Sequence, residues 1–231
     1  ARAAERMNVI FILIDDMGLT DAGCYGSTFY ETPQIDRLAR DGVKFTAAYS
    51  ACTVCSPTRA ALLTGQYPAR LHLTDWIAGH VAPKARLRVP DWQKSLRDEW
   101  TTLPALLRAA GYATASIGKW HLGPEPPTAR GFDVNIGGTE KGQPPSFFAP
   151  YKIPTLPEGP AGEFLTDRLT AEAEKFIAQN KDRPFFLYLP HFAVHQPIAG
   201  KKDVIEKYRA KRSEASPQKN PVYAALVESV D

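Results

Sequence analysis

The apolar residues of this chain follow two different spacings that alternate along the sequence. Continuous β-branched and aromatic runs stand at residues 8–14 and 185–189, and a third run stands at residues 112–117. The first run predicts a strand buried on both faces of a central sheet, and the second predicts another buried strand. The run at 112–117 and the shorter one at 43–45 predict two further strands.

Helical spacing fills the segments between these runs. Thr32 followed by Pro33 predicts an N-cap and a first helical residue, and Gly42 ends that helix. The same pattern covers residues 102–111, while residues 165–180 place their apolar side chains on one helical face. Strands that alternate with helices predict an α/β fold with a largely parallel central sheet flanked by helices.

Two segments depart from this alternation. Residues 137–162 are rich in Pro and Gly, which predicts a long ordered loop lying over a substrate cleft. Residues 221–231 start a helix and offer no C-cap, so we expect the chain to be cut there and its fold to be incomplete at the C-terminus. We find no repeat or linker, and residues 1–231 are therefore interpreted as the N-terminal part of one catalytic α/β domain.

Composition narrows the classes of partner. The 231 residues are 44% hydrophobic, which suffices for a packed core. A formal charge of +3, from 28 basic and 25 acidic residues, predicts no nucleic-acid partner. The longest apolar run, residues 9–14, is too short for a membrane span, and no signal peptide precedes it. Three cysteines exclude a disulfide scaffold, and Cys24 and Cys52 are expected to be structural.

Cys55 is the first candidate for chemistry. Pro57 suits a first helical turn, residues 60–63 continue the helix and Gly65 ends it. Cys55 would then lie at a helix N-terminus, where free N–H groups favour an anion or a thiolate. Two other interpretations stay open: Cys52 and Cys55 have the spacing of a redox Cys-x-x-Cys motif, and Cys55 could be buried and inert.

Asp15 and Asp16 are the second candidates, because they directly follow the first predicted strand. Ligands of open α/β sheets bind at the carboxyl ends of strands. Adjacent carboxylates repel each other there unless a cation joins them, and calcium takes ~6–8 oxygen ligands. Considered alone, Asp-Asp-Met-Gly is more often simply a turn.

Two longer motifs resemble a known family. Residues 55–65, Cys-Ser-Pro-Thr-Arg-Ala-Ala-Leu-Leu-Thr-Gly, resemble the signature of the type I, formylglycine-dependent sulfatases of arylsulfatase and saccharide sulfatase type, with Thr58 where Ser is commoner. Residues 111–123, which include Gly-Lys-Trp-His-Leu-Gly, are similar to the family's second signature. The resemblance covers nearly all of this chain but only the N-terminal half of the usual family length. It implies an alkaline-phosphatase-like fold and export to the periplasm or beyond the cell.

The resemblance also implies a site. Cys55 would be oxidised to formylglycine by a maturation enzyme, and the hydrated aldehyde would attack sulfur. Asp15 and Asp16, with residue 55, would hold calcium. Arg59 and Lys119 would place positive charge around the sulfuryl group. A further Asp, Asn and Lys would come from beyond this chain.

The histidines receive separate roles from the same resemblance. His121 would remove a proton from residue 55 so that the aldehyde reforms and sulfate leaves. It lies two residues after Lys119, and on an extended segment both would project from one face. His195, which precedes a Gln-Pro, would protonate the leaving alcohol. His191 is expected to be a packing residue, since a zinc site made with His195 lacks a nearby cysteine or acidic partner.

The substrate predicted from this resemblance is a sulfated small molecule or saccharide. Trp76, His80 and the loop at 137–162 are candidates for sugar contacts, and Thr74-Asp75-Trp76 favours a saccharide sulfatase. A phosphatase or phosphonate monoester hydrolase of the same superfamily is the nearer alternative. A non-catalytic truncated chain is the more distant one.

We expect the 231-residue chain alone to bind calcium weakly and to hydrolyse sulfate esters negligibly, whereas the full-length protein does both. Asp15 and Asp16 supply only two carboxylates where calcium takes ~6–8 oxygens. Calorimetric calcium titration of both proteins, combined with a sulfatase assay of each, checks this. Tight binding and full turnover by residues 1–231 would contradict the assignment of the missing ligands.

Overall fold

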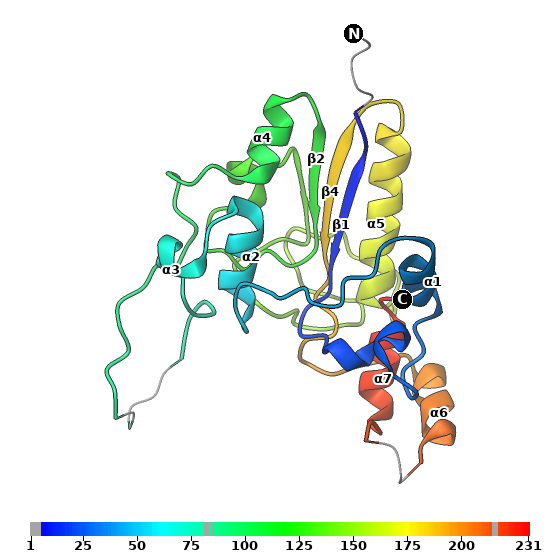
Figure 1. The fold of residues 1–231 in the computed structure, drawn as a ribbon. Coiled ribbons are helices and arrows are strands. Elements are labelled where there is room, and N and C mark those ends of the chain that lie inside the picture. The colour runs from blue at the N-terminus through cyan, green and yellow to red at the C-terminus, as the bar shows by residue number, and fades with distance from the viewer. Residues whose placement is uncertain (1–5, 81–83, 85, 214–216) are drawn as a thin grey trace.

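The computed structural model describes residues 6–80, 84, 86–213 and 217–231. Its centre is a four-stranded sheet in the order β1-β4-β2-β3, and every strand pair is parallel. Figure 1 shows the strands running side by side with helices on both faces. The predicted parallel α/β class is confirmed. The strands are β1 (Val9–Leu13), β2 (Ala113–Ile117), β3 (Val134–Ile136) and β4 (Phe185–Pro190).

The helices form two layers and a separate group beside the carboxyl edge of the sheet. In Figure 1, α5 covers one face of the sheet, α2 and α4 lie on the other, and α6 and α7 pack together below. Among the described residues, no helix has the length and apolar character needed to cross a membrane. The helices are α1 (Pro33–Asp41), α2 (Cys55–Thr64), α3 (Pro68–Leu71), α4 (Leu103–Ala109), α5 (Leu165–Asn180), α6 (Lys202–Lys211) and α7 (Pro221–Glu228), with short 3-10 turns η1 (Leu19–Asp21), η2 (Gly23–Tyr25) and η3 (Pro127–Arg130).

The start of α1 lies where the Thr-Pro pair predicts it, but a different side chain caps it. Thr32 Oγ1 accepts a hydrogen bond from the backbone of Gly23 at 2.8 Å instead of capping its own helix. The carboxylate of Asp231 accepts from the backbone of Gln34 at 3.0 Å and of Ile35 at 2.8 Å. An anion at a helix N-terminus satisfies free N–H groups and complements the helix dipole.

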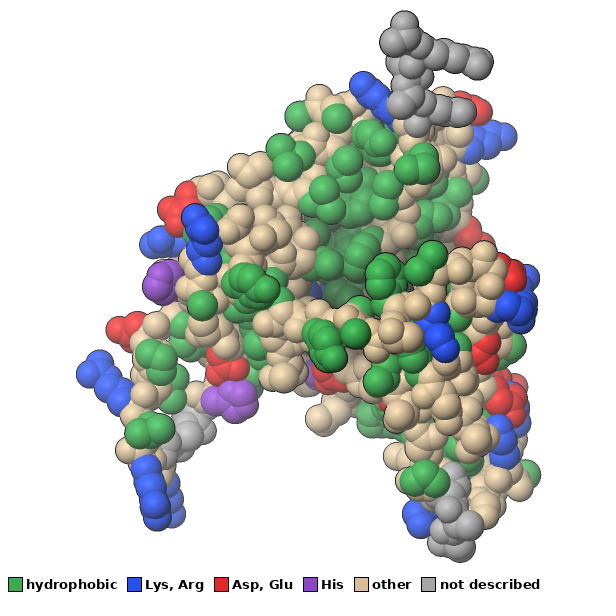
Figure 2. Space-filling model, in the orientation of Figure 1, with side chains coloured by type: hydrophobic (Ala, Val, Ile, Leu, Met, Phe, Trp, Pro, Cys, Tyr) green, Lys and Arg blue, Asp and Glu red, His purple; other side chains and the backbone are tan. Residues whose placement is uncertain are grey.

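The predicted burial of β1 on both faces is wrong. Val9, Ile10 and Ile12 keep 38%, 48% and 51% of their surface exposed. The reason is topological: among the described strands β1 pairs with β4 alone, so it is an edge strand of this sheet. Hydrophobic side chains gather openly over this part of the sheet in Figure 2, as expected for a sheet edge that lacks a cover.

Two short segments also differ from the prediction. Residues 43–45 form no strand, and Val43 and Phe45 are largely exposed. A strand needs a hydrogen-bonded neighbour, and none of the described strands pairs with this segment. In contrast, β3 pairs with β2 although its three residues show no extended apolar run. Whether residues 43–45 and β3 form strands therefore depended on a neighbouring strand to pair with. The local sequence pattern does not show such a neighbour.

The segment at 137–162 is an irregular loop, as predicted, with one isolated bridge between Phe148 and Phe164. Its first part, residues 141–145, lies near Asp16 and His121 at the carboxyl edge of the sheet. Its later part, including Phe147, Tyr151 and Leu156, is buried in the same hydrophobic cluster as α5. The loop therefore belongs to the core as much as to the surface.

Candidate active site

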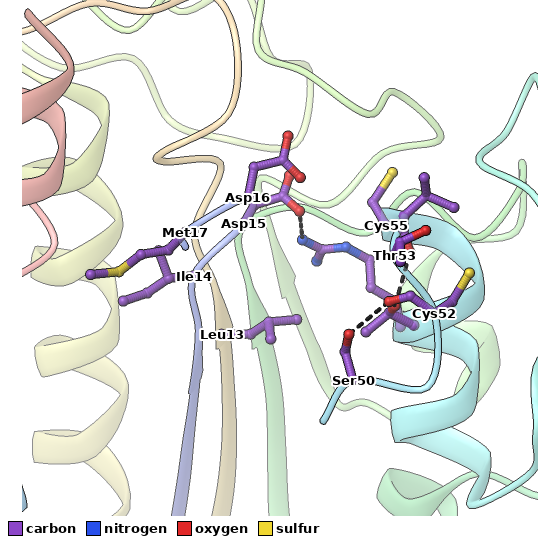
Figure 3. Close-up of a pocket in the computed structure, with 12 residues that line it drawn as sticks. Leu13, Ile14, Asp15, Asp16, Met17, Ser50, Cys52, Thr53 and Cys55 are labelled. Carbon is purple, nitrogen blue, oxygen red and sulfur yellow. Dashed lines mark hydrogen bonds and ion pairs between the residues drawn. The ribbon is translucent and has the colours of Figure 1, made fainter. Parts of the chain in front are cut away.

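The predicted site residues converge at the carboxyl edge of the sheet. Parallel strands end at the same edge, so the residues that follow β1, β2 and β4 are brought together there. The start of α2 lies opposite the end of β1, and Figure 3 shows Cys55 and Thr53 across from the two aspartates. The assembled set is Asp15 and Asp16 after β1, Lys119 and His121 after β2, His195 after β4, and Cys55 and Arg59 on α2.

A buried ion cluster lies at the centre of this site. Arg59 Nη2 is 3.1 Å from Asp15 Oδ1, and Lys119 Nζ donates to Asp15 Oδ2. Arg59 Nη1 also donates to the Lys119 carbonyl at 2.9 Å. Burial acts to raise the pKa of Asp15, but Arg59 and Lys119 outweigh it and the pKa falls below its usual value. Asp15 is therefore an anion held between two cations.

A glycine allows the end of β2 to meet the end of β4. Gly118 has φ 127°, and a Cβ there would overlap the carbonyl oxygen of Pro190. The next amide, from Lys119, donates to that same carbonyl at 2.8 Å. Burial, followed by Arg59, lowers the pKa of Lys119 below its usual value, while Asp15 opposes this shift.

His121 presents an acceptor nitrogen to Cys55. Its Nε2 contacts the carbonyl of Ile77, and a carbonyl can only accept, so Nε2 carries the proton of the neutral ring. Nδ1, 3.2 Å from the sulfur of Cys55, then offers a lone pair. Burial lowers the pKa of His121 to about 4, so the ring is neutral at pH 7.

Lys119 and His121 face the same site, but not because they lie on an extended segment, as the sequence predicted. His121 has φ 57°, in the left-handed region, so the segment is not an extended strand. Its backbone N–H donates to the Thr139 carbonyl at 3.0 Å. The turn at His121, with this contact to the long loop, directs the ring toward Cys55.

Asp16 and His195 form the more open side of the site. His195 Nε2 is 3.5 Å from Asp16 Oδ2, and His195 Nδ1 lies 3.0 Å from the carbonyl of Gln196. His191 is separate and buried, and its Nδ1 has no hydrogen-bond partner among the described residues. Burial lowers the pKa of His191 to about 4, and the expected packing role fits a neutral, enclosed ring.

Asp15 and Asp16 are ligands of the type that calcium prefers, but two carboxylates are fewer than calcium needs. Oxygen ligands suit a hard cation, and Asp15 and Asp16 are adjacent at the mouth of the site. Within the described chain, no group of three or more His, Cys, Asp or Glu side chains could hold a metal. The repulsion between the two carboxylates is reduced by the protein cations Arg59 and Lys119, which both contact Asp15. The calcium assignment stays a prediction.

The structure does not favour the redox interpretation of the cysteine pair. The sulfur atoms of Cys52 and Cys55 are drawn well apart in Figure 3, and all three cysteines are free. The carbonyl of Cys52 accepts from Ser50 and from Thr58, at 2.7 and 2.9 Å. Cys52 thus helps to shape the turn before α2, in keeping with its expected structural role.

A cleft of about 710 Å³ opens beside Cys55. Trp76, a candidate for sugar contacts, lines this cleft. His80, the other candidate, does not line it and pairs with Asp75 at 2.7 Å. The sequence predicted the loop as a whole but not the amide side chains of Gln143 and Gln196. Their position beside the predicted motifs was the only signal for them. The other lining residues include Lys141 to Pro145 of the loop, Ile77 and Gln196.

Comparisons with known proteins agree with this geometry. The family model described as Sulfatase matches residues 7–231. Human N-acetylgalactosamine-6-sulfatase is 35% identical over 87% of this chain and 42% of that protein. Human steryl-sulfatase is 28% identical over 100% of this chain and 51% of that protein.

Solved structures give the same picture. The crystal structure of Ps i-CgsB has a TM-score of 0.78 and 29% identity, covering 98% of this chain and 52% of that one. A structure in complex with its substrate D-glucosamine-2-N,6-O-disulfate has a TM-score of 0.70 and 25% identity, covering 92% of this chain and 40% of that one. The chain spans about two fifths to half the length of these relatives.

Replacement of Gly142 by Ala should destabilise the protein by about 1–3 kcal/mol, the usual cost of overpacking. A Cβ at Gly142 would lie 2.7 Å from Nδ1 and 2.8 Å from Nε2 of His121, whose ring is held by Ile77 and Cys55. Urea denaturation measures the change. Gly162→Asn in the same loop is the control, because a Cβ there meets no atom within 4 Å and Asn accepts a left-handed backbone. Equal stability of the Gly142→Ala variant and the wild type would contradict the prediction.

Proposed function

The chain belongs to the sulfatase family, and from this membership we propose that the complete protein hydrolyses sulfate esters, with a sulfated saccharide as its substrate. One observation carries the proposal. Cys55 begins α2 within 3.2 Å of the unprotonated nitrogen of His121, beside the buried pair of Arg59 and Lys119. A nucleophile position, a neutral base and two fixed cations are the parts that transfer of an anionic group requires.

Two groups would complete the site. We expect Cys55 to become formylglycine, whose hydrate supplies an oxygen nucleophile at the start of α2. We expect Asp15 and Asp16, together with residues from the rest of the protein, to hold calcium, which supplies positive charge beside that nucleophile. The oxygen donors of the two aspartates support the choice of a hard cation. The formylglycine expectation rests on the Cys-x-Pro-x-Arg pattern.

Arg59 and Lys119 stabilise charge without having to move. Both side chains are buried, and Asp15 fixes both, so their orientation is set before the substrate arrives. Preorganised donors of this kind act strongly on a developing negative charge because they cost no reorganisation. In this role they contact the sulfuryl oxygens beside residue 55.

The two histidines divide the proton transfers. His121 is neutral and directs a lone pair at residue 55, so it accepts a proton from that residue. His195 lines the same cleft, next to Asp16 and Gln196, and the alcohol portion of the ester would lie in that cleft. It gives a proton to the leaving oxygen. Each transfer is worth ~10²–10⁴ in rate.

The cleft supports a saccharide as the alcohol. Trp76 offers an apolar aromatic surface, and Gln143 and Gln196 offer amide donors and acceptors for hydroxyl groups. The human relative is named for a sulfated amino sugar, and one structural neighbour was solved with a disulfated glucosamine. The family resemblance further supports an exported protein, matured by a formylglycine-generating enzyme and acting in the periplasm or secreted.

Peptide mass spectrometry tests the nucleophile. In protein produced with the maturation machinery, the peptide that contains Cys55 should show sulfur replaced by oxygen and two hydrogens lost. Cys55→Ser should then lower kcat by at least about a hundredfold, because a serine cannot regenerate an aldehyde. An active enzyme that contains only unmodified Cys55 would disprove the nucleophile assignment.

His195→Ala should slow esters of poor leaving alcohols more than esters of good ones. A sugar alkoxide needs the proton that His195 gives, whereas nitrophenolate leaves without it, so we expect the two losses to differ by at least about tenfold. The measurement is kcat/KM of the wild type and of His195→Ala, each with a sulfated monosaccharide and with nitrophenyl sulfate. Turnover of nitrophenyl phosphate by the wild type tests the phosphatase alternative. Equal losses would show that His195 only positions the substrate.

A further inference from the structure

Three side chains beneath the candidate active site carry buried polar atoms without hydrogen-bond partners. They are Arg59, through Nε and Nη2, Ser116, through Oγ, and Tyr188, through its hydroxyl. Buried polar groups in native proteins are nearly always paired, because an unpaired one loses its hydrogen bonds to water without replacing them. A group of three such residues at one place therefore requires a physical explanation.

The strand register brings these residues together. Tyr188 of β4 lies directly opposite Ser116 of β2, and neighbours in register point to the same face of a sheet. That face is the one covered by α2, since Tyr188 packs in the same hydrophobic cluster as Ala60 and Leu63 of α2. Arg59 of the same helix contacts Asp15 after β1 and the Lys119 carbonyl after β2, and these two strands flank β4. Its guanidinium therefore lies over the end of β4, on the face that carries Tyr188.

The guanidinium of Arg59 is held on one side only. Nη1 donates to the Lys119 carbonyl, and Nη2 lies 3.1 Å from Asp15 without the alignment of a hydrogen bond. Burial acts to lower the pKa of Arg59, but Tyr188 and Asp15 outweigh it, which agrees with the position of the guanidinium over the end of β4. Burial also raises the pKa of Tyr188, so the oxygen is a neutral hydroxyl with lone pairs to accept from Arg59.

We propose that Tyr188 is a positioning residue that holds the guanidinium of Arg59 from beneath the site, with Ser116 as a second polar neighbour. Asp15 and the Lys119 carbonyl restrain one side of the guanidinium, and the hydroxyl of Tyr188 restrains the other. Tyr188 does not reach the substrate and acts only through Arg59. The consequence for turnover rests on the proposed function, whereas the restraint of Arg59 does not.

The hydroxyl can be removed without disturbing the core. Tyr188 is fully buried and its ring stacks on Phe132, with 6.0 Å between the ring centroids. Tyr188→Phe keeps this packing and deletes only the acceptor. Tyr208→Phe is the matched control, because Tyr208 is equally buried and its hydroxyl accepts from the backbone of Glu31 at 3.1 Å, on α6 and outside the site.

Two measurements on the complete, matured protein test the proposal. The first is hydrogen exchange of the Arg59 side-chain N–H groups by NMR with labelled arginine, assigned by their loss in Arg59→Lys. We expect exchange to be at least about tenfold faster in Tyr188→Phe than in the wild type, since exchange follows local opening. Tyr208→Phe should leave it unchanged. Unchanged exchange in Tyr188→Phe would overturn the proposal, whether or not the protein hydrolyses sulfate esters.

The second measurement is turnover of nitrophenyl sulfate in a double-mutant cycle. Tyr188→Phe should lower kcat about tenfold and leave KM within about twofold of the wild type. This loss of kcat is smaller than the ~10²–10³-fold loss that is typical when a direct hydrogen-bond donor to the reacting group is removed. In the Arg59→Lys background the same change should cost nothing further. An equal loss in both backgrounds would overturn the proposal. A wild type without turnover, but with Tyr188-dependent exchange at Arg59, would instead contradict the proposed function and leave the positioning role supported.

Discussion

The carboxylate of Asp15 is the constraint on which the site depends. It is a buried anion, and removing one partner from a buried ion pair costs roughly 3–5 kcal/mol. Its partners Arg59 and Lys119 come from α2 and from the turn after β2. One carboxylate thus fixes three separate parts of the chain at the carboxyl edge of the sheet. Cys55 and His121 lie within a few residues of these partners and are positioned by the same cluster.

The cluster also sets the division of charge across the site. Positive charge is concentrated and buried at Arg59 and Lys119, while His121 is kept neutral by burial and by those same neighbours. A neutral ring beside two cations can act as a base, whereas a third cation there could not. His195 lies in the more open cleft and contacts Asp16, so its environment differs from that of His121. The two histidines of the candidate site therefore lie in two different environments.

Close packing of backbone at glycine supports this arrangement. Gly118 lets the end of β2 approach Pro190, and Gly142 lets the long loop lie against the ring of His121. Neither glycine contributes a side chain of its own to the site. Both nevertheless determine where Lys119 and His121 lie, because each adjoins one of these residues in the sequence or in space.

The sequence by itself determined the parallel α/β class and most helix boundaries, and it predicted which residues form the candidate site. The ends of a helix depend on residues next to them in the sequence. The side chain of Thr102 caps α4, and Gly65 ends α2 at φ 66°. The site residues were identified because the motifs that contain them are continuous in sequence. Their roles, and the calcium assignment, stay predictions.

Only the tertiary structure decided what depends on partners distant in the sequence. Whether an apolar run becomes a central strand, an edge strand such as β1, or no strand, as at residues 43–45, depends on which neighbour pairs with it. The protonated nitrogen of His121 depends on the carbonyl of Ile77, 44 residues away in sequence. The position of Tyr188 beneath Arg59 depends on strand register. Local patterns record the preference of a segment, whereas these features arise from contacts that form only when the chain is folded.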